Sequence, residues 1–166
     1  MEHELELMWA RKLGLTTLDT TLLNELLHLM VRTKVDYTIF FRALSHIPDE
    51  LSALKKSFYQ ASSEELDAKW HDWLHRWRAH VASSGDIRKT SDAMKGVNPS
   101  VTWREWLVAP AYQQAELGDH NLVHELQEVF SQPYDEPPPE LAAKYDRLKP
   151  KEFFNAGGVS HYSCSS

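Results

Sequence analysis

The 166 residues suffice for one domain with a buried core, and a composition of 42% hydrophobic and 25% charged residues is ordinary for a soluble globular protein. The formal net charge of -6, with basic residues dispersed among acidic ones, argues against a nucleic-acid partner, which needs clustered Lys and Arg. No apolar run approaches the about 20 residues that span a bilayer. The single cysteine, Cys164, excludes an internal disulfide and a cysteine-rich zinc site.

Apolar residues at helical intervals predict a first helix over residues 4–13, which Gly14 ends. Asp19 is expected to cap the next helix, because its carboxylate can accept hydrogen bonds from the free amides of the first turn. The wide apolar face of this second helix is more typical of a core than of a cofactor site. Its members are Leu22, Leu23, Leu26, Leu27, Met30 and Val31.

Three more helices are predicted before Gly85. One covers residues 37–47 and ends at Pro48, because proline lacks the amide hydrogen that a helix needs. A short amphipathic helix follows within residues 51–58. A long helix then begins at a serine and glutamate cap over residues 62–65 and continues to about Ser83. The face of the long helix that we expect to be core consists of Leu66, Trp70, Trp73, Leu74, Trp77 and Val81.

The remainder of the chain begins with a turn at Asn98 and Pro99. A helix is expected from about Trp103 to Gly118, with a kink at Pro110. Asp119 is expected to cap another short helix. The inner face of that helix is predicted to be Leu122, Val123, Leu126, Val129 and Phe130.

No segment alternates like a strand, so the predicted fold is all-α. Four prolines interrupt the helical pattern over residues 133–139, and a short helix is expected near residues 141–145. The composition therefore divides the chain into a helical region over residues 1–131 and a second part over residues 132–166. The second part combines the Pro-rich segment, the short helix and a tail.

His71 and His75 form a pair with a metal-ligand spacing. They are four residues apart on one helical face, as in zinc hydrolases, which place a glutamate after the first histidine. Here that acid is Asp72, and no third ligand is evident downstream, so two partly exposed histidines are the favoured interpretation. Gly157 and Gly158 lack the strand and helix that flank a phosphate-binding loop. We therefore predict no catalytic, cofactor-binding or metal-binding residue in this chain.

A series of short segments in a fixed order extends over nearly the whole chain. Together the segments resemble the C-terminal region of the selenoprotein O family. They are MWARKLGL at residues 8–15, DYT at 36–38, FRAL at 41–44, WLHRW at 73–77, MKGVNP at 94–99, REW at 104–106, GD at 118–119, PYDE at 133–136 and SCSS at 163–166.

Members of this family resemble protein kinases in fold and transfer AMP from ATP to Ser, Thr and Tyr hydroxyls of proteins. The resemblance implies that the complete protein needs ATP and Mg²⁺. It implies as partners an upstream kinase-like catalytic region and the modified proteins. The family's nucleotide-handling residues belong to that upstream region, so the chain is expected to be a non-catalytic fragment with a structural or regulatory role. Met1 would be an internal methionine, a fragment boundary or an alternative start. The implied location is mitochondrial in a eukaryote and cytoplasmic otherwise.

Cys164 is the redox candidate. Some family members carry a Cys-x-x-selenocysteine pair at the C-terminus, where Cys164 takes the selenocysteine-like place and His161 the partner position. The resemblance implies a reversible disulfide between Cys164 and an upstream cysteine, and the alternative is an ordinary exposed thiol. For the chain as a whole, the alternative is a stand-alone helical protein-interaction module.

Overall fold

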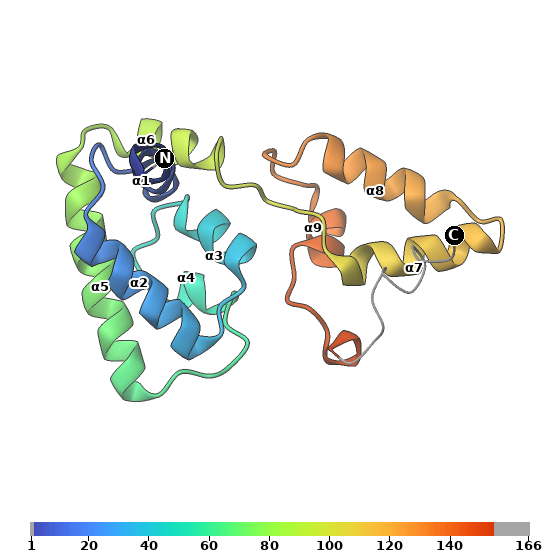
Figure 1. Ribbon diagram of the computed structural model, residues 1–166, viewed down its shortest axis with the longest axis horizontal. Helices are drawn as coiled ribbons and strands as arrows, with labels where there is room; N and C mark the ends of the chain where they lie inside the picture. Colours follow the sequence, from blue (N-terminus) through green and yellow to red (C-terminus); the bar gives the residue numbers. More distant parts are fainter. Residues whose placement is uncertain (1, 155–166) are drawn as a thin grey trace. The chain divides into compact units, whose positions relative to one another are not determined.

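The computed structural model describes residues 2–154, and these residues form helices without any strand (Figure 1). The predicted all-α fold is confirmed. The chain packs into two compact units, unit 1 (Met1–Pro99) and unit 2 (Ser100–Ser166), each with its own apolar core. This division precedes the compositional boundary after residue 131, because the Pro-rich segment packs within unit 2. There Ser100 donates from its amide to the Pro133 carbonyl at 2.7 Å, and the Tyr145 side chain joins the core.

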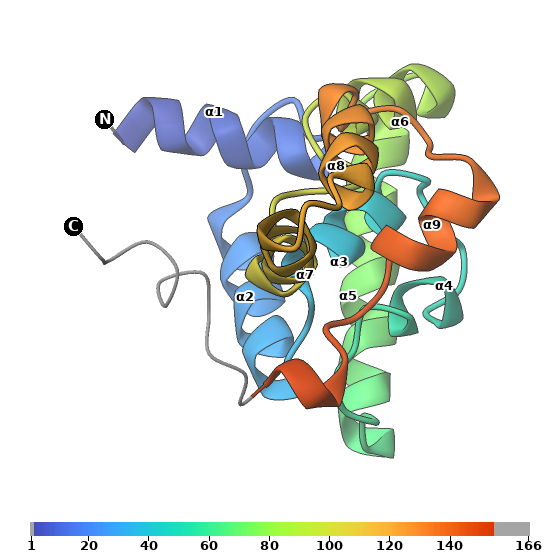
Figure 2. The ribbon, with the colours of Figure 1, turned by 90° about the vertical axis from the view of Figure 1, so that its right-hand side faces the viewer.

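Unit 1 is built around two helices that pack along each other, α2 and α5, as both views show (Figure 1 and Figure 2). The helices of unit 1 are, in chain order, α1 (Glu2–Leu13), α2 (Thr20–Thr33), α3 (Tyr37–Leu44), α4 (Ser52–Lys55), α5 (Glu64–Ser83) and α6 (Ile87–Lys95).

Side-chain caps begin α2 and α5 where the sequence predicts them. The Asp19 carboxylate accepts hydrogen bonds from the amides of Thr21 and Leu22 at 2.9 and 3.0 Å, and the Ser63 hydroxyl accepts one from the Leu66 amide at 3.3 Å. Helix α6 was not predicted, because Met94 is its one buried apolar residue and gives no periodic signal. The overlooked local signal is Asp86, which caps α6.

Tryptophans of α5 fill the core of unit 1, as predicted. Trp70, Trp73 and Trp77 are fully buried. The indole of Trp73 donates to the Leu22 carbonyl and that of Trp77 to the Leu13 carbonyl, each at 2.9 Å, so the large apolar rings carry no unsatisfied N–H at these two positions. The Trp73 and Trp77 rings stack, with centroids 5.9 Å apart and an interplanar angle of 6°.

Some expected core positions were wrong. Val31 is 77% exposed, whereas Leu29, which the pattern had omitted, is buried. The apolar stripe of α2 is therefore narrower than predicted, because Val31 lies about 100° around the helix from Met30, outside the buried face. Leu66 is only partly buried at the edge of the core.

Unit 2 contains an antiparallel pair of helices, α7 (Glu105–Glu116) and α8 (Asn121–Ser131), followed by α9 (Pro139–Tyr145) and a 3-10 turn, η1 (Lys151–Phe153) (Figure 1). Trp106, Leu107, Leu126 and Val129 lie in its core. Helix α7 continues through Pro110. The expected start at Trp103 was wrong, because Trp103 precedes α7.

Helix α8 also differs in part from its prediction. The Asp119 carboxylate accepts a hydrogen bond from the Asn121 amide at 3.0 Å, as a cap should, although the residue directly before the helix is His120. Val123 was expected in the core but is an exposed residue. Within residues 2–154, no helix is both long enough and apolar enough to cross a membrane.

Candidate functional site

The structure leaves the predicted histidine pair on an exposed surface. His71 and His75 lie on the outer side of α5, while the tryptophans between and beside them face the core. Among the described residues, no three His, Cys, Asp or Glu side chains come together as a metal-ligand group. Cys164 and His161 lie outside the described residues, so the disulfide of Cys164 stays a prediction.

Four of the segments that carry the family resemblance meet at one place in unit 1, which we name the Lys12 cluster (Trp9, Lys12, Tyr37, Phe41 and Asn98). The Lys12 ammonium donates a hydrogen bond to Asn98 Oδ1 at 2.8 Å. It also lies 5.1 and 4.8 Å from the ring centroids of Tyr37 and Phe41, where the negative ring faces attract a cation. Burial lowers the pKa of Lys12 and raises the pKa of Tyr37.

Aromatic rings surround this lysine on the side of α1 and α3. The Tyr37 and Phe41 rings lie 4.6 Å apart, and Trp9 contacts both at 6.4 and 6.0 Å between centroids. Offset and edge-on contacts of this kind are favourable beyond the area that they bury. The rings therefore hold α1 against α3 and shield one side of the ammonium from water.

The buried side chain of Asn98 connects the cluster to the end of α1 and to the end of α3. Its Nδ2 donates to the Lys12 carbonyl and to Ser45 Oγ, both at 3.0 Å. The Asn98 carbonyl in turn accepts from Arg42 Nη1 at 3.0 Å, and the same nitrogen donates to the Lys95 carbonyl at 3.2 Å. The chain after α6 is thus tied to α1 and α3 through named polar contacts.

A small open cavity of about 360 Å³ lies beside the cluster, lined in part by Arg11, Lys12, Tyr37 and Glu4. Its rim carries charges of both signs. Lys12 and Asn98 are 86 residues apart in the sequence, so no local sequence pattern could have identified the pair. Chemically, the cluster joins α1, α3 and the chain after α6, and its cation is held by an amide oxygen and two rings.

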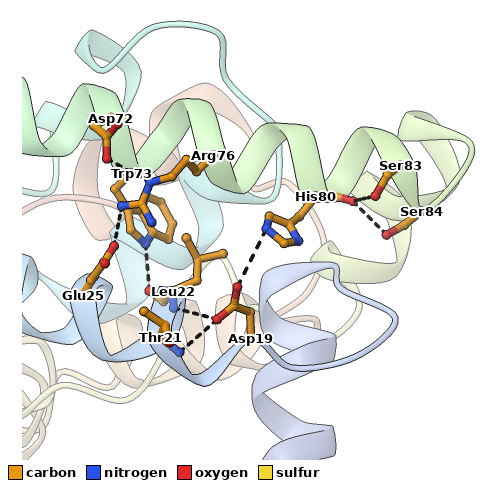
Figure 3. Close-up of polar contacts among 10 residues, drawn as sticks. All are labelled: Asp19, Thr21, Leu22, Glu25, Asp72, Trp73, Arg76, His80, Ser83 and Ser84. Atoms are coloured by element: carbon orange, nitrogen blue, oxygen red, sulfur yellow. Dashed lines mark hydrogen bonds and ion pairs between the residues drawn. The ribbon is translucent and has the colours of Figure 1, made fainter.

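A larger groove of about 670 Å³ lies between α2 and α5. Arg76 of α5 bridges its neighbour Asp72, at 2.9 Å from Nε to Oδ2, and Glu25 of α2, to which Nη2 also donates (Figure 3). Both hydrogen bonds raise the pKa of Arg76, and the bond to Glu25 has the larger effect. Further along the same helix pair, His80 Nε2 lies 3.8 Å from Asp19 Oδ2, an ion pair only when His80 is protonated.

This groove combines an apolar floor with a charged rim. Leu29 and Trp73 contribute to the floor, while Glu25 and Asp72 on the rim both pair with Arg76. Exposed ion pairs of this kind are screened by water and contribute little to stability. The arrangement joins α2 to α5 through the side chain of Arg76.

The comparisons with known proteins agree on one family. The family model described as "Protein adenylyltransferase SelO" matches residues 2–131. The chain is 33% identical to "Protein nucleotidyltransferase YdiU" of Aromatoleum aromaticum, an alignment that covers 99% of this chain and 33% of that protein. It is 37% identical to the protein of the same name from Pseudomonas fluorescens, covering 82% and 28%, and 36% identical to that from Salmonella schwarzengrund, covering 89% and 28%. The chain spans about a third of the length of these curated relatives.

Proposed function

Because the chain belongs to the SelO family of protein adenylyltransferases, we propose that it is the helical portion of an enzyme that transfers AMP from ATP to Ser, Thr or Tyr hydroxyls of proteins. The match over residues 2–131 is the observation that carries this proposal. ATP supplies the AMP group in the complete protein, and Mg²⁺ neutralises charge on the phosphates. The catalytic groups belong to a kinase-like region upstream of this chain, which is its first partner.

The role that we propose for the chain itself is structural. Its principal polar contacts hold segments of unit 1 together, since Lys12 binds Asn98 and Arg42 binds two backbone carbonyls. A cation held in this way by the protein's own atoms is suited to fixing helix positions. The Lys12 cluster would therefore stabilise a surface of unit 1 that contacts the catalytic region.

Genomic sequence provides the first test. An open reading frame that continues upstream of the Met1 codon is expected to encode a kinase-like region of about twice this chain's length, because the relatives are about three times as long as the chain. A stop codon directly upstream, with no such region, would favour a stand-alone interaction module instead.

The biochemical test compares the complete protein with residues 1–166 alone. Each is incubated with Mg²⁺, a mixed protein acceptor and ATP labelled either at the α-phosphate or at the γ-phosphate. We expect the complete protein to incorporate the α-label and not the γ-label, because AMP transfer releases the γ-phosphate in pyrophosphate. We expect the chain alone to incorporate neither. Incorporation of the γ-label would show a protein kinase and contradict the proposal.

A further inference from the structure

Unit 2 exposes an apolar groove between α7 and α8, on the side of the helix pair that α9 does not cover. The groove has a volume of about 510 Å³. Three of its lining residues are exposed, Trp103 by 67%, Tyr112 by 46% and Val123 by 38%. Contiguous exposed apolar side chains of this kind, which cost free energy in water, mark interaction sites in folded proteins.

The groove is ordered by its own contacts. Trp103 stacks on Phe130 of α8, with centroids 5.4 Å apart and an interplanar angle of 23°, so its indole is held against the helix. On α8 the lining residues Val123, Gln127 and Phe130 follow one another at intervals of three and four, which is one continuous helical stripe. The surface is therefore a shaped recess about two helical turns long.

Acidic residues outnumber basic ones along the two helices of the groove. Helices α7 and α8 carry Glu105, Glu116, Glu125 and Glu128 and neither Lys nor Arg, and Arg104 directly precedes α7. Glu116 lies one helical turn after the groove residue Tyr112, so it flanks the recess at the end of α7.

Two basic residues of unit 2 have partners that do not line the groove. Lys144 pairs with Glu125, and Arg147 lies over the Trp106 ring at 5.3 Å. The acidic excess along α7 and α8 therefore favours a partner with positive charges around an apolar face.

We propose that this groove binds an amphipathic helix of a partner protein, with apolar side chains at intervals of three and four residues and Lys or Arg on its flanks. A helix fits better than a strand, because two antiparallel helices present a furrow into which the ridge of a third helix packs. Its apolar side chains would cover Tyr112 and Val123, and its basic flank would approach Glu116. The proposal concerns unit 2 alone and does not depend on AMP transfer.

The test uses residues 1–166 and a fluorescein-labelled designed peptide of about 14 residues, with leucines at positions i, i+3, i+4 and i+7 and lysines elsewhere. Fluorescence anisotropy is expected to show saturable binding in the micromolar range, weakening as salt screens the charges. The same peptide with every lysine replaced by glutamate is expected to bind at least about tenfold more weakly.

Variants at exposed positions locate the binding without disturbing the cores. Val123→Ser is expected to weaken binding of the lysine peptide about tenfold. The matched control is Val31→Ser, an exposed valine on unit 1, which should leave the affinity unchanged. Glu116→Lys should weaken the lysine peptide and strengthen the glutamate peptide.

Several results would overturn the proposal. They are absence of saturable binding by the lysine peptide, equal affinity for both peptides, and loss of binding with Val31→Ser in place of Val123→Ser. Dimerisation of the chain that Val123→Ser abolishes, measured by sedimentation, would assign the groove to a second copy and would also overturn it.

Discussion

The side chain of Asn98 uses each of its polar atoms to join segments that are distant in sequence. Oδ1 accepts from Lys12 of α1, and Nδ2 donates to the Lys12 carbonyl and to Ser45 at the end of α3. Because Asn98 is fully buried, no water can replace a lost contact at this position without opening the structure.

Asn98→Ala is therefore expected to destabilise unit 1 by about 2–3 kcal/mol, since it leaves the Lys12 ammonium and a buried carbonyl without their partners. Urea unfolding followed by near-ultraviolet circular dichroism, which reports on the stacked Trp73 and Trp77, measures the change. The matched control is Asn24→Ala on the exposed side of α2, for which we expect less than about 0.5 kcal/mol. Equal costs for the two variants would show that the buried amide has no special role.

At the scale of elements, Gly14 determines how closely α1 approaches α6. Its φ of 66° lies in the left-handed region, where a helix commonly ends on glycine. A Cβ at this position would lie 2.6 Å from Met94 Sδ and 2.7 Å from Thr90 Cγ2. Both the backbone conformation and the contact with α6 therefore require glycine.

Gly14→Ala is expected to cost about 2–4 kcal/mol, the sum of backbone strain and overpacking against Met94. Gly96→Ala provides the control, because Gly96 has an ordinary φ of -68° and its Cβ would meet its nearest atom at 3.4 Å. We expect that control to change the free energy of unfolding by less than about 1 kcal/mol. Urea unfolding at one protein concentration compares the two, and a Gly14→Ala protein as stable as Gly96→Ala would disprove the close packing of α1 on α6.

At the scale of the whole molecule, the two units have separate cores. In unit 2 a charged, hydrogen-bonded carboxylate connects α8 to α9. The Glu125 carboxylate of α8 accepts hydrogen bonds from Lys144 and from the Tyr145 hydroxyl at the end of α9. The bond from Lys144, followed by that from Tyr145, lowers the pKa of Glu125. Burial and the same carboxylate raise the pKa of Tyr145.

Unit 2 should consequently lose stability in acid. Because the pKa of Glu125 is lower in the folded than in the unfolded state, its contribution is complete above the unfolded value, about 4.3, and is lost as the pH falls through the folded value. Glu125→Gln is expected to cost about 1 kcal/mol at pH 7, after allowance for solvent screening, and to flatten the pH dependence of unit 2 between pH 5 and 3, roughly the range in which carboxylates titrate.

Trp106 lies in the core of unit 2, so its indole NMR resonance reports on the folding of this unit. The measurement follows that resonance during urea titrations at several pH values. Glu128→Gln on the exposed side of the same helix is the control, and it should retain the acid sensitivity of the unaltered chain. An unaltered chain whose unit 2 is equally stable at pH 7 and pH 3 would contradict the proposed contribution of Glu125 to stability.

Local signals in the sequence determined much of this protein. The end of α1 at Gly14, the caps at Asp19 and Ser63 and the buried face of Trp70, Trp73 and Trp77 all depend on residues within one or two helical turns, so they are readable along the chain. The family likewise follows from short segments in order, which the match over residues 2–131 confirms.

Tertiary structure alone decided which of those helical faces are covered and by what. Val31 and Val123 are apolar yet exposed, because no described element of their own unit covers them, and α6 forms with a single buried apolar residue. The meeting of Lys12 with Asn98 and the packing of residues 132–154 into unit 2 depend on contacts between distant segments. A hydrophobic pattern states which surfaces avoid water, but the partner of each surface is set by the three-dimensional packing of the whole unit.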